Sequence, residues 1–206
     1  MTAAPIAGET RPVRAARPLG WLVPAVIAGG LVPFALIALR AARGDLGANP
    51  IATALNQLGL LSLLFLMACL CCTPLKLFTG QNWPIRIRRT LGLLAFFSAL
   101  THFLVYLVLD QTLALDRVVA DVVKRPFIAV GFSALVVLVP LAATSTKRAV
   151  QRLGFKRWKL LHRLVYVAAA LAVIHFMLRV KADLTEPLVY AALLGLLLAA
   201  RVAKRS

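Results

Sequence analysis

Long apolar runs separated by short charged segments are the dominant pattern along this chain. Four runs lack Asp, Glu, Lys and Arg entirely, and they are 21, 25, 20 and 21 residues long: Leu19–Leu39, Ile51–Leu75, Thr90–Leu109 and Pro126–Thr146. A helix needs roughly 20 residues to cross the hydrocarbon core of a bilayer. Each of the four runs therefore predicts a membrane-spanning helix.

Two further runs are less regular. Leu160–Leu178 is interrupted only by Arg163, and Pro187–Ala200 contains 14 uncharged residues extended by Leu184 before it and Val202 after it. All six runs are apolar on every side, whereas the strands of a membrane barrel alternate between apolar and polar residues. The sequence thus predicts an all-α, polytopic membrane protein, a bundle of six transmembrane helices.

The two ends of the chain differ from these runs. Residues 1–18 are rich in Ala, Pro and Arg without apolar periodicity, which predicts a flexible cytoplasmic tail. The first apolar run exceeds the roughly 7–15 apolar residues of a cleavable signal peptide, so we expect it to be retained. We interpret residues 19–203 as one transmembrane domain and residues 204–206 as a C-terminal tail.

Charge adds an orientation to this picture. The 206 residues are 61% hydrophobic and carry a formal net charge of +17. When alternate connecting segments are assigned to opposite sides, 17 of the 24 Lys and Arg residues fall on the side of the N-terminus. The positive-inside rule then predicts that both termini are cytoplasmic. A basic chain could also bind nucleic acid, but these apolar runs exclude a soluble DNA-binding fold, so the expected surroundings are lipid.

Three histidines, His102, His162 and His175, fall within or at the edge of the predicted spans. An ionisable group inside a bilayer is costly and is a functional candidate by default. No Asp or Glu lies within a predicted span, which counts against a proton pathway or a cation transporter. The alternative is a neutral histidine that merely hydrogen-bonds to a neighbouring helix.

Depth separates the three histidines. If the third helix begins just after Arg89 and the fifth near Leu160, His102 and His175 lie 13 and 15 residues from those starts, each roughly 20 Å deep. His162 lies at the cytoplasmic mouth. Two imidazoles at matched depth can supply both axial ligands of one haem iron, an arrangement that suits electron transfer. We therefore predict a haem held by His102 and His175 in the outer half of the membrane.

His162 is harder to place. It stands 13 residues before His175, about 140° away around an ideal helix, which counts against one haem-binding stripe on the fifth helix. It is a candidate ligand of a second, inner haem, or an interfacial histidine that faces headgroups or water.

Other residues indicate packing rather than chemistry. Cys69, Cys71 and Cys72 are odd in number and have no partner elsewhere, so we interpret them as small apolar residues. No phosphate-binding loop or nucleophile elbow is present. The segments are also too short for a flavin and nicotinamide domain. We therefore expect electrons to come from a quinol or a separate reductase.

Several ordered motifs resemble one family. They are Leu31–Phe34 (LVPF), Gly44–Pro50 (GDLGANP), Thr73–Leu75 (TPL), Ile85–Gly92 (IRIRRTLG), Lys124–Pro126 (KRP), Thr144–Ser145 (TS) and Trp158–Tyr166 (WKLLHRLVY), together with the three histidines. Between about residues 20 and 203 the chain resembles the MsrQ (YedZ) family, haem-containing membrane subunits of bacterial methionine sulfoxide reductase systems. That family lies within the ferric reductase-like transmembrane superfamily.

The resemblance implies a function. MsrQ-like proteins are six-helix, multi-pass proteins of the bacterial inner membrane that bind haem b and are also FMN-binding. They take electrons from the quinone pool and pass them to MsrP, a periplasmic molybdopterin enzyme that repairs oxidised methionines. By this resemblance residues 19–203 form a ferric reductase-like haem domain in which His102, His162 and His175 ligate one haem or two. The chain would be an electron-transfer subunit rather than a stand-alone catalyst.

Two departures from the family pattern bear on this interpretation. Some members carry a histidine where this chain has Asn56, so a ligand at that position is not assumed. The larger NADPH oxidases of the superfamily pair two histidines on each of two helices, whereas the third helix here has only His102, so an inner haem would need another partner for His162. The acceptor is expected to dock on the outer segments 110–125 and 179–186. The alternative function is a non-redox membrane protein, either a small transporter or an assembly scaffold, whose histidines are structural.

Overall fold

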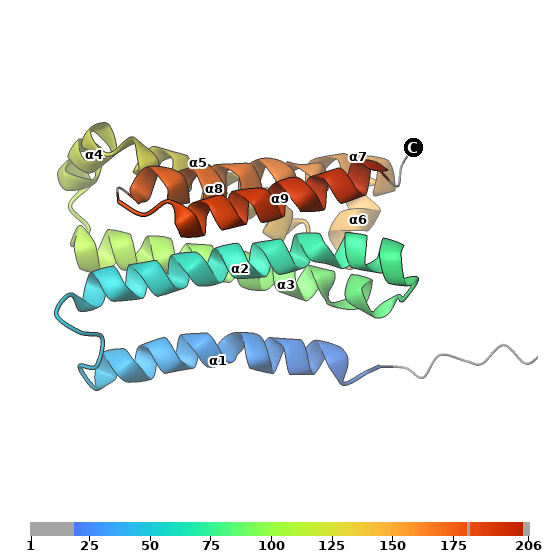
Figure 1. The fold of residues 1–206 in the computed structure, drawn as a ribbon, viewed down its shortest axis with the longest axis horizontal. Helices are drawn as coiled ribbons and strands as arrows, with labels where there is room; N and C mark the ends of the chain where they lie inside the picture. Colours follow the sequence, from blue (N-terminus) through green and yellow to red (C-terminus); the bar gives the residue numbers. More distant parts are fainter. Residues whose placement is uncertain (1–18, 181, 204–206) are drawn as a thin grey trace, which may run out of the picture.

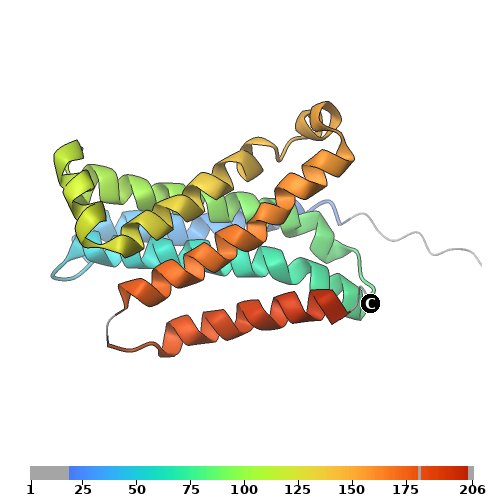
Figure 2. The same ribbon diagram turned by 90° about the horizontal axis from the view of Figure 1, so that it is seen from above.

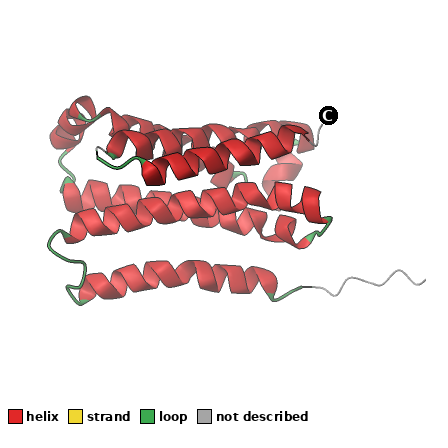
Figure 3. Ribbon diagram, viewed as in Figure 1, coloured by secondary structure: helices red, strands yellow, loops and turns green. Residues whose placement is uncertain are grey.

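The computed structural model describes residues 19–180 and 182–203, and the elements in these ranges are helices (Figures 1 and 3). Six of them are long and apolar enough to span a membrane. In chain order these spans are α1 (Leu22–Ala42), α2 (Pro50–Thr79), α3 with a π-helical turn (Trp83–Asp110), α5 (Pro126–Ala143), α7 with α8 (Phe155–Arg179) and α9 (Thr185–Ala203). The prediction of an all-α bundle with six spans is confirmed. The two predicted tails lie outside the described residues.

The core is built from two helix pairs. α2 packs along α3, and α5 packs along α8. Their buried faces meet in one apolar cluster, to which α9 adds Leu194. Figure 2 shows α8 running obliquely across the bundle and α9 lying along its edge beside α2. Large apolar side chains such as Phe97, Val136 and Leu196 are about half exposed or more, as expected for helices that face lipid.

α1 stands apart from this core. It forms a separate layer below α2 and α3 in Figure 1, and Gly30 is its one buried residue. A Cβ atom at Gly30 would lie 2.5 Å from Cδ1 of Leu94 on α3. The missing side chain therefore lets the two helices touch at this point.

The third span begins earlier than the charge pattern suggested. Its helix starts at Trp83, so the prediction of a start just after Arg89 is wrong. Pro84 lies in the first turn, where its fixed φ favours a helix start and its missing N–H costs nothing. Arg86 and Arg88 consequently lie on the helix, where long side chains can extend toward the headgroups. The apolar run therefore indicates which residues can lie in the bilayer, whereas the helix itself begins several residues earlier.

The sixth span is longer than its uncharged run. It extends from Thr185 to Ala203 and includes the buried Arg201. The Arg201 guanidinium donates hydrogen bonds to the carbonyl of Leu70 on α2 and to the hydroxyl of Tyr166 on α8. These two hydrogen bonds hold the charge of Arg201, on α9, against α2 and α8.

At the other terminus of α9, hydrogen bonds from Thr185 lower the pKa of the Asp183 carboxyl.

Short helices mark the two ends of the bundle. α4 (Leu115–Lys124) joins the third span to α5, and α6 (Lys147–Leu153) joins α5 to α7. Figure 1 places α4 at one end and α6 at the other, and we name the two ends accordingly. The described chain begins and finishes at the α6 end. The segment 110–125, expected to be a connecting segment, thus contains a helix that the sequence analysis missed.

Candidate functional site

Two imidazoles meet inside the bundle. The ring centroids of His102 on α3 and His175 on α8 are 6.3 Å apart, and the ring planes are 84° to each other. Both side chains are partly buried and line a cavity of about 670 Å³ between α2, α3, α5 and α8. Cavities of roughly 300–1,000 Å³ are typical of cofactor and small-molecule sites.

Each histidine is held by a backbone carbonyl of a neighbouring helix. His102 Nδ1 lies 2.8 Å from the carbonyl oxygen of Leu55 on α2, and His175 Nδ1 lies 2.7 Å from that of Phe127 on α5. A carbonyl can only accept, so Nδ1 carries the hydrogen in both rings. The Nε2 lone pair is then left for a ligand, as in metal-binding histidines.

A glycine lies one helical turn beyond each accepting carbonyl. A Cβ atom at Gly59 would lie 3.2 Å from Cε1 of His102, and one at Gly131 would lie 2.6 Å from Nδ1 of His175. The absent side chains let both rings lie against a helix backbone. We call this arrangement of carbonyl and glycine a histidine seat. The histidine seats were not predicted from the sequence. Both share one spacing, an apolar residue followed four positions later by Gly.

The donor set fits an iron porphyrin better than a bare metal ion. Among residues 19–180 and 182–203 no group of three or more His, Cys, Asp or Glu side chains could hold a metal. A metal bound by two imidazoles must therefore bring its other ligands with it. The separation of 6.3 Å between the ring centroids accommodates two imidazole–metal bonds of about 2 Å each. Most of the cavity wall is apolar, which suits a flat macrocycle.

The rim of the cavity carries a cation. Arg179 follows His175 by one helical turn and donates to the side-chain oxygen of Asn56. Its guanidinium carbon lies 5.9 Å from the centroid of the Phe176 ring. In the described part of the chain the one ion pair is Arg125–Asp121, so no carboxylate lies within 4 Å of Arg179. Asn56 thus serves Arg179 in this chain.

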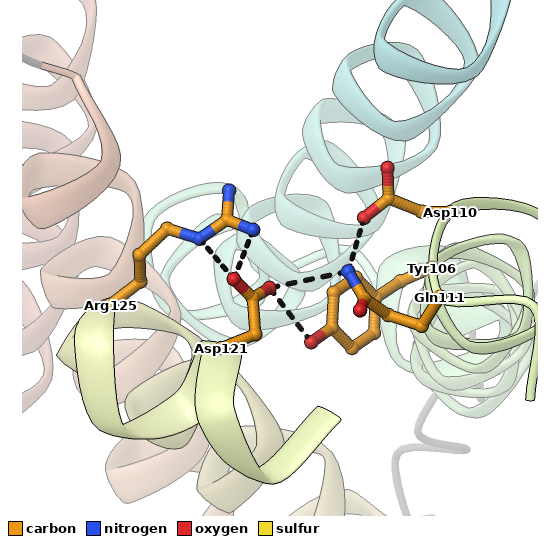
Figure 4. Close-up of polar contacts among 5 residues, drawn as sticks. All are labelled: Tyr106, Asp110, Gln111, Asp121 and Arg125. Carbon is orange, nitrogen blue, oxygen red and sulfur yellow. Dashed lines mark hydrogen bonds and ion pairs between the residues drawn. The ribbon is translucent and has the colours of Figure 1, made fainter. Parts of the chain in front are cut away.

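A polar network lies at the α4 end of the cavity, and Figure 4 shows its hydrogen bonds. Asp121 of α4 accepts hydrogen bonds from the Tyr106 hydroxyl at 3.0 Å, from Gln111 Nε2 at 3.3 Å and from Arg125 Nε at 2.6 Å. Gln111 also donates to Asp110 at 2.7 Å. Tyr106, Asp110 and Arg125 line the cavity. The network therefore ties α4 to the cavity wall.

His162 lies away from the paired histidines. A 3-10 turn, His162–Leu164, separates α7 from α8, so the angle calculated for an ideal helix does not apply. The hydroxyl of Thr144 donates to the carbonyl of Pro140 and therefore accepts from His162 Nε2, 3.1 Å away. The His162 ring also packs on Trp158, with centroids 4.2 Å apart. The structure thus brings two of the three candidate ligands, His102 and His175, together. The Nε2 of the third, His162, is already used in a hydrogen bond to Thr144.

The cysteines lie near the α6 end of α2. Cys69 and Cys72 are buried and Cys71 is exposed, and all three are free thiols. Cys69 donates to the carbonyl of Arg88 at 3.3 Å. Burial agrees with a packing role for two of the three, while Cys71 faces outward.

Comparison with known proteins gives a consistent family. Residues 53–173 match the family described as ferric reductase like transmembrane component, a segment that contains His102 and His162 and ends just before His175. A protein of Rhodospirillum rubrum named protein-methionine-sulfoxide reductase heme-binding subunit MsrQ is 52% identical over 178 residues, 86% of either chain.

Relatives with the same name extend this match. One from Deinococcus radiodurans is 48% identical over 185 residues, which are 90% of this chain and 91% of the relative. One from Brucella anthropi is 44% identical over 198 residues, which are 96% and 89% of the two chains. The chain therefore belongs to the MsrQ family of ferric reductase-like transmembrane proteins.

Proposed function

We propose that the chain is a membrane electron-transfer subunit that carries haem b in the bacterial inner membrane. It would take electrons from the quinone pool and pass them to a periplasmic molybdopterin methionine sulfoxide reductase of the MsrP type, which repairs oxidised periplasmic proteins. The observation that carries this proposal is the pair of seated imidazoles on one cavity. The names of the relatives, heme-binding subunits of a methionine sulfoxide reductase, support it.

Different residues of the cavity would contact different parts of the haem. His102 and His175 would each give Nε2 to the iron, while the carbonyls of their seats fix the ring orientation. Held in this way, haem b would supply a one-electron carrier, which favours electron transfer over oxygen chemistry. The apolar part of the wall would contact the flat faces of the macrocycle.

The rim would receive the acidic edge of the porphyrin. A guanidinium makes strong, charge-assisted hydrogen bonds to carboxylates. Arg179 is a rim cation with a neutral amide as partner, whereas Arg125 already pairs with Asp121. We assign the contact with a haem carboxylate to Arg179 and Asn56.

The charge distribution supports an orientation of the chain in the membrane. The basic segments around Arg86–Arg89 and Lys147–Lys159 belong to the α6 end, which the positive-inside rule makes cytoplasmic. His175 lies about one helical turn from Arg179, where the span ends at the opposite side. The haem would therefore stand near the periplasmic face, where the acceptor docks on the segments 110–125 and 179–186.

The α6 end would be the entry for electrons. His162 is the candidate ligand of a second, inner haem there, and its release from Thr144 would be needed to free Nε2. Quinol, and FMN on the family resemblance, are proposed as the other redox ligands of the chain.

A difference spectrum tests the proposal. After expression with an adequate supply of haem, the purified protein should show a b-type signal in the dithionite-reduced minus oxidised spectrum. His102→Ala and His175→Ala should each abolish the signal of the paired site, while His175→Met, which keeps a ligand, should shift it. A wild-type protein without any b-type signal would overturn the proposal in favour of a transporter or scaffold with structural histidines.

The haem count needs a second measurement. The pyridine haemochrome ratio per chain should be close to one if only the paired histidines ligate, and His162→Ala should leave it unchanged. A ratio close to two that falls to one in His162→Ala would assign an inner haem to His162. Size-exclusion profiles of each variant establish that the bundle is intact.

A further inference from the structure

α4 presents an apolar stripe that no part of the described chain covers. Leu115, Val119 and Val123 are 72%, 63% and 79% exposed. Their spacing of four residues places them on one face of the helix. The opposite side carries the charged residues Arg117 and Lys124. α4 is thus an amphipathic helix whose apolar face points away from the protein.

The ends of α4 fix its position relative to the membrane. Four residues, 111–114, connect it to the π-helical turn that completes the third span at Asp110, and Arg125 alone separates it from α5. Both ends are therefore held at the ends of membrane spans. A helix of 10 residues is about 15 Å long, so its axis must run along the bilayer boundary. Figures 1 and 2 show it at the end of the bundle.

The contacts of Asp121 fix the rotation of α4 about its axis. Asp121 faces the bundle, where it accepts hydrogen bonds from Tyr106 and Arg125 (Figure 4). Val119 and Val123 are each two positions from Asp121, which places them roughly 160° away around the helix. The stripe is consequently turned outward by the same network that anchors the helix.

The neighbouring surface indicates what covers the stripe. On the adjoining π-helical turn, Val108 and Leu109 are 43% and 53% exposed, and they belong to a helix that is long and apolar enough to span a membrane. The four-residue connection 111–114 places the stripe close to this apolar surface, at the end of the span. Arg117 and Lys124, on the polar side of α4, are cations that can reach lipid phosphates. We propose that α4 is an interfacial helix whose stripe is seated in the headgroup–acyl boundary of the leaflet at the α4 end.

The lipid contact of α4 also has a consequence for the cavity. Tyr106 and Arg125, which line the cavity, are held by Asp121 of the lipid-seated helix. Lipid contact on one side of α4 thereby supports the cavity wall on the other. This inference is independent of which group the cavity binds.

Site-directed fluorescence quenching tests the lipid seat. Val119→Cys and Arg117→Cys are each made in a C69A/C71A/C72A background, labelled with bimane, and placed in phosphatidylcholine nanodiscs. The quenchers are lipid carrying a doxyl group at carbon 5 and aqueous iodide. Label at position 119 should be quenched by the lipid about twofold more than label at position 117, with the reverse order for iodide.

Two results would overturn the lipid seat. Iodide quenching at position 119 equal to that at position 117, without lipid quenching, would place the stripe in water. Shielding from both quenchers would show that protein covers it. Val123→Cys repeats the measurement one turn away, and position 117 reports on the same fold, so a failure of one variant does not decide the outcome.

Discussion

The imidazole of His175 lies in the space that a side chain at Gly131 would occupy. A Cβ atom on Gly131 would lie 2.6 Å from Nδ1 of His175 and 2.8 Å from Cε1, closer than non-bonded atoms approach one another. The ring therefore fills the space of a missing side chain while Nδ1 donates to Phe127. The equivalent contact between Gly59 and His102 is looser, at 3.2 Å.

Gly131→Ala should displace His175 and reduce haem occupancy well below that of the wild type. The added methyl group overpacks the seat, at a cost of about 1–3 kcal/mol, and the ring can relieve it only by leaving Phe127. Gly59→Ala should have a smaller effect in the same direction. The haem-to-protein ratio and the thermal unfolding midpoint report both changes.

Gly195→Ala is the matched control for these substitutions. It adds the same methyl group to α9, where a Cβ atom would meet nothing within 4 Å. It should retain full haem occupancy. Equal occupancy in Gly131→Ala and Gly195→Ala would show that the seat does not position His175.

Arg179→Gln should lower the midpoint potential of the bound haem. A cation at the rim stabilises the reduced iron, which carries one positive charge fewer, so its removal favours the oxidised form. The expected shift is on the order of tens of millivolts. Arg179→Lys keeps the positive charge, so its midpoint potential should stay close to that of the wild type. Potentiometric titration measures it, with Arg40→Gln as control because Arg40 is an exposed arginine that bonds to a loop carbonyl at the same end. A shift of equal size in both variants would contradict a rim role for Arg179.

Asp121→Asn should loosen α4. The amide removes the ion pair with Arg125 and weakens the acceptor that serves Tyr106 and Gln111. Because Arg125 is about half exposed, we expect a loss of only about 1 kcal/mol, seen as several-fold faster amide hydrogen exchange across α4. Asp116→Asn, in the first turn of the same helix, should leave exchange near the wild-type rate. Identical exchange in the two variants would exclude the network as the anchor.

Thr144→Val should destabilise the α6 end without affecting the paired histidines. The substitution removes the acceptor of His162 Nε2, and an unpaired polar group inside a protein costs about 1–3 kcal/mol. Thr144→Ser keeps the hydroxyl and should restore the unfolding midpoint. If haem occupancy at the paired site falls together with stability in Thr144→Val, the two ends of the bundle are coupled rather than independent.

The number of spans could be predicted from sequence because the bilayer selects on length and charge alone. The helix starts could not, since Trp83 begins α3 through a proline-led first turn despite three arginines nearby. α4 left a readable signal in the apolar spacing of Leu115, Val118, Val119 and Val122, but its short length concealed it among charged residues.

The sequence predicted the pairing of His102 with His175 from matched depth, since distance along a helix translates into position across a membrane. Counted from the observed span starts at Trp83 and Phe155, the two residues lie 19 and 20 residues in, so their depths still match although the start assumed for the third helix was wrong. Their seats were hidden because the acceptors are backbone carbonyls, which no side-chain pattern reveals. The isolation of His162 depends on a 3-10 turn and on the hydroxyl of Thr144 from another helix. Such tertiary partners become visible only when the helices are assembled.

The use of carbonyls in both seats limits how the site can vary. No single side-chain replacement at Leu55 or Phe127 removes a main-chain oxygen, so each acceptor stays in place as long as its helix exists. A change that displaces the ring itself, such as Gly131→Ala, is needed to break the hydrogen bond. That acceptor raises the basicity of the opposite nitrogen. The electron density that the two rings would offer a bound haem would therefore be set by the backbone, and substitutions would adjust its redox behaviour chiefly through the rim charge and the cavity wall.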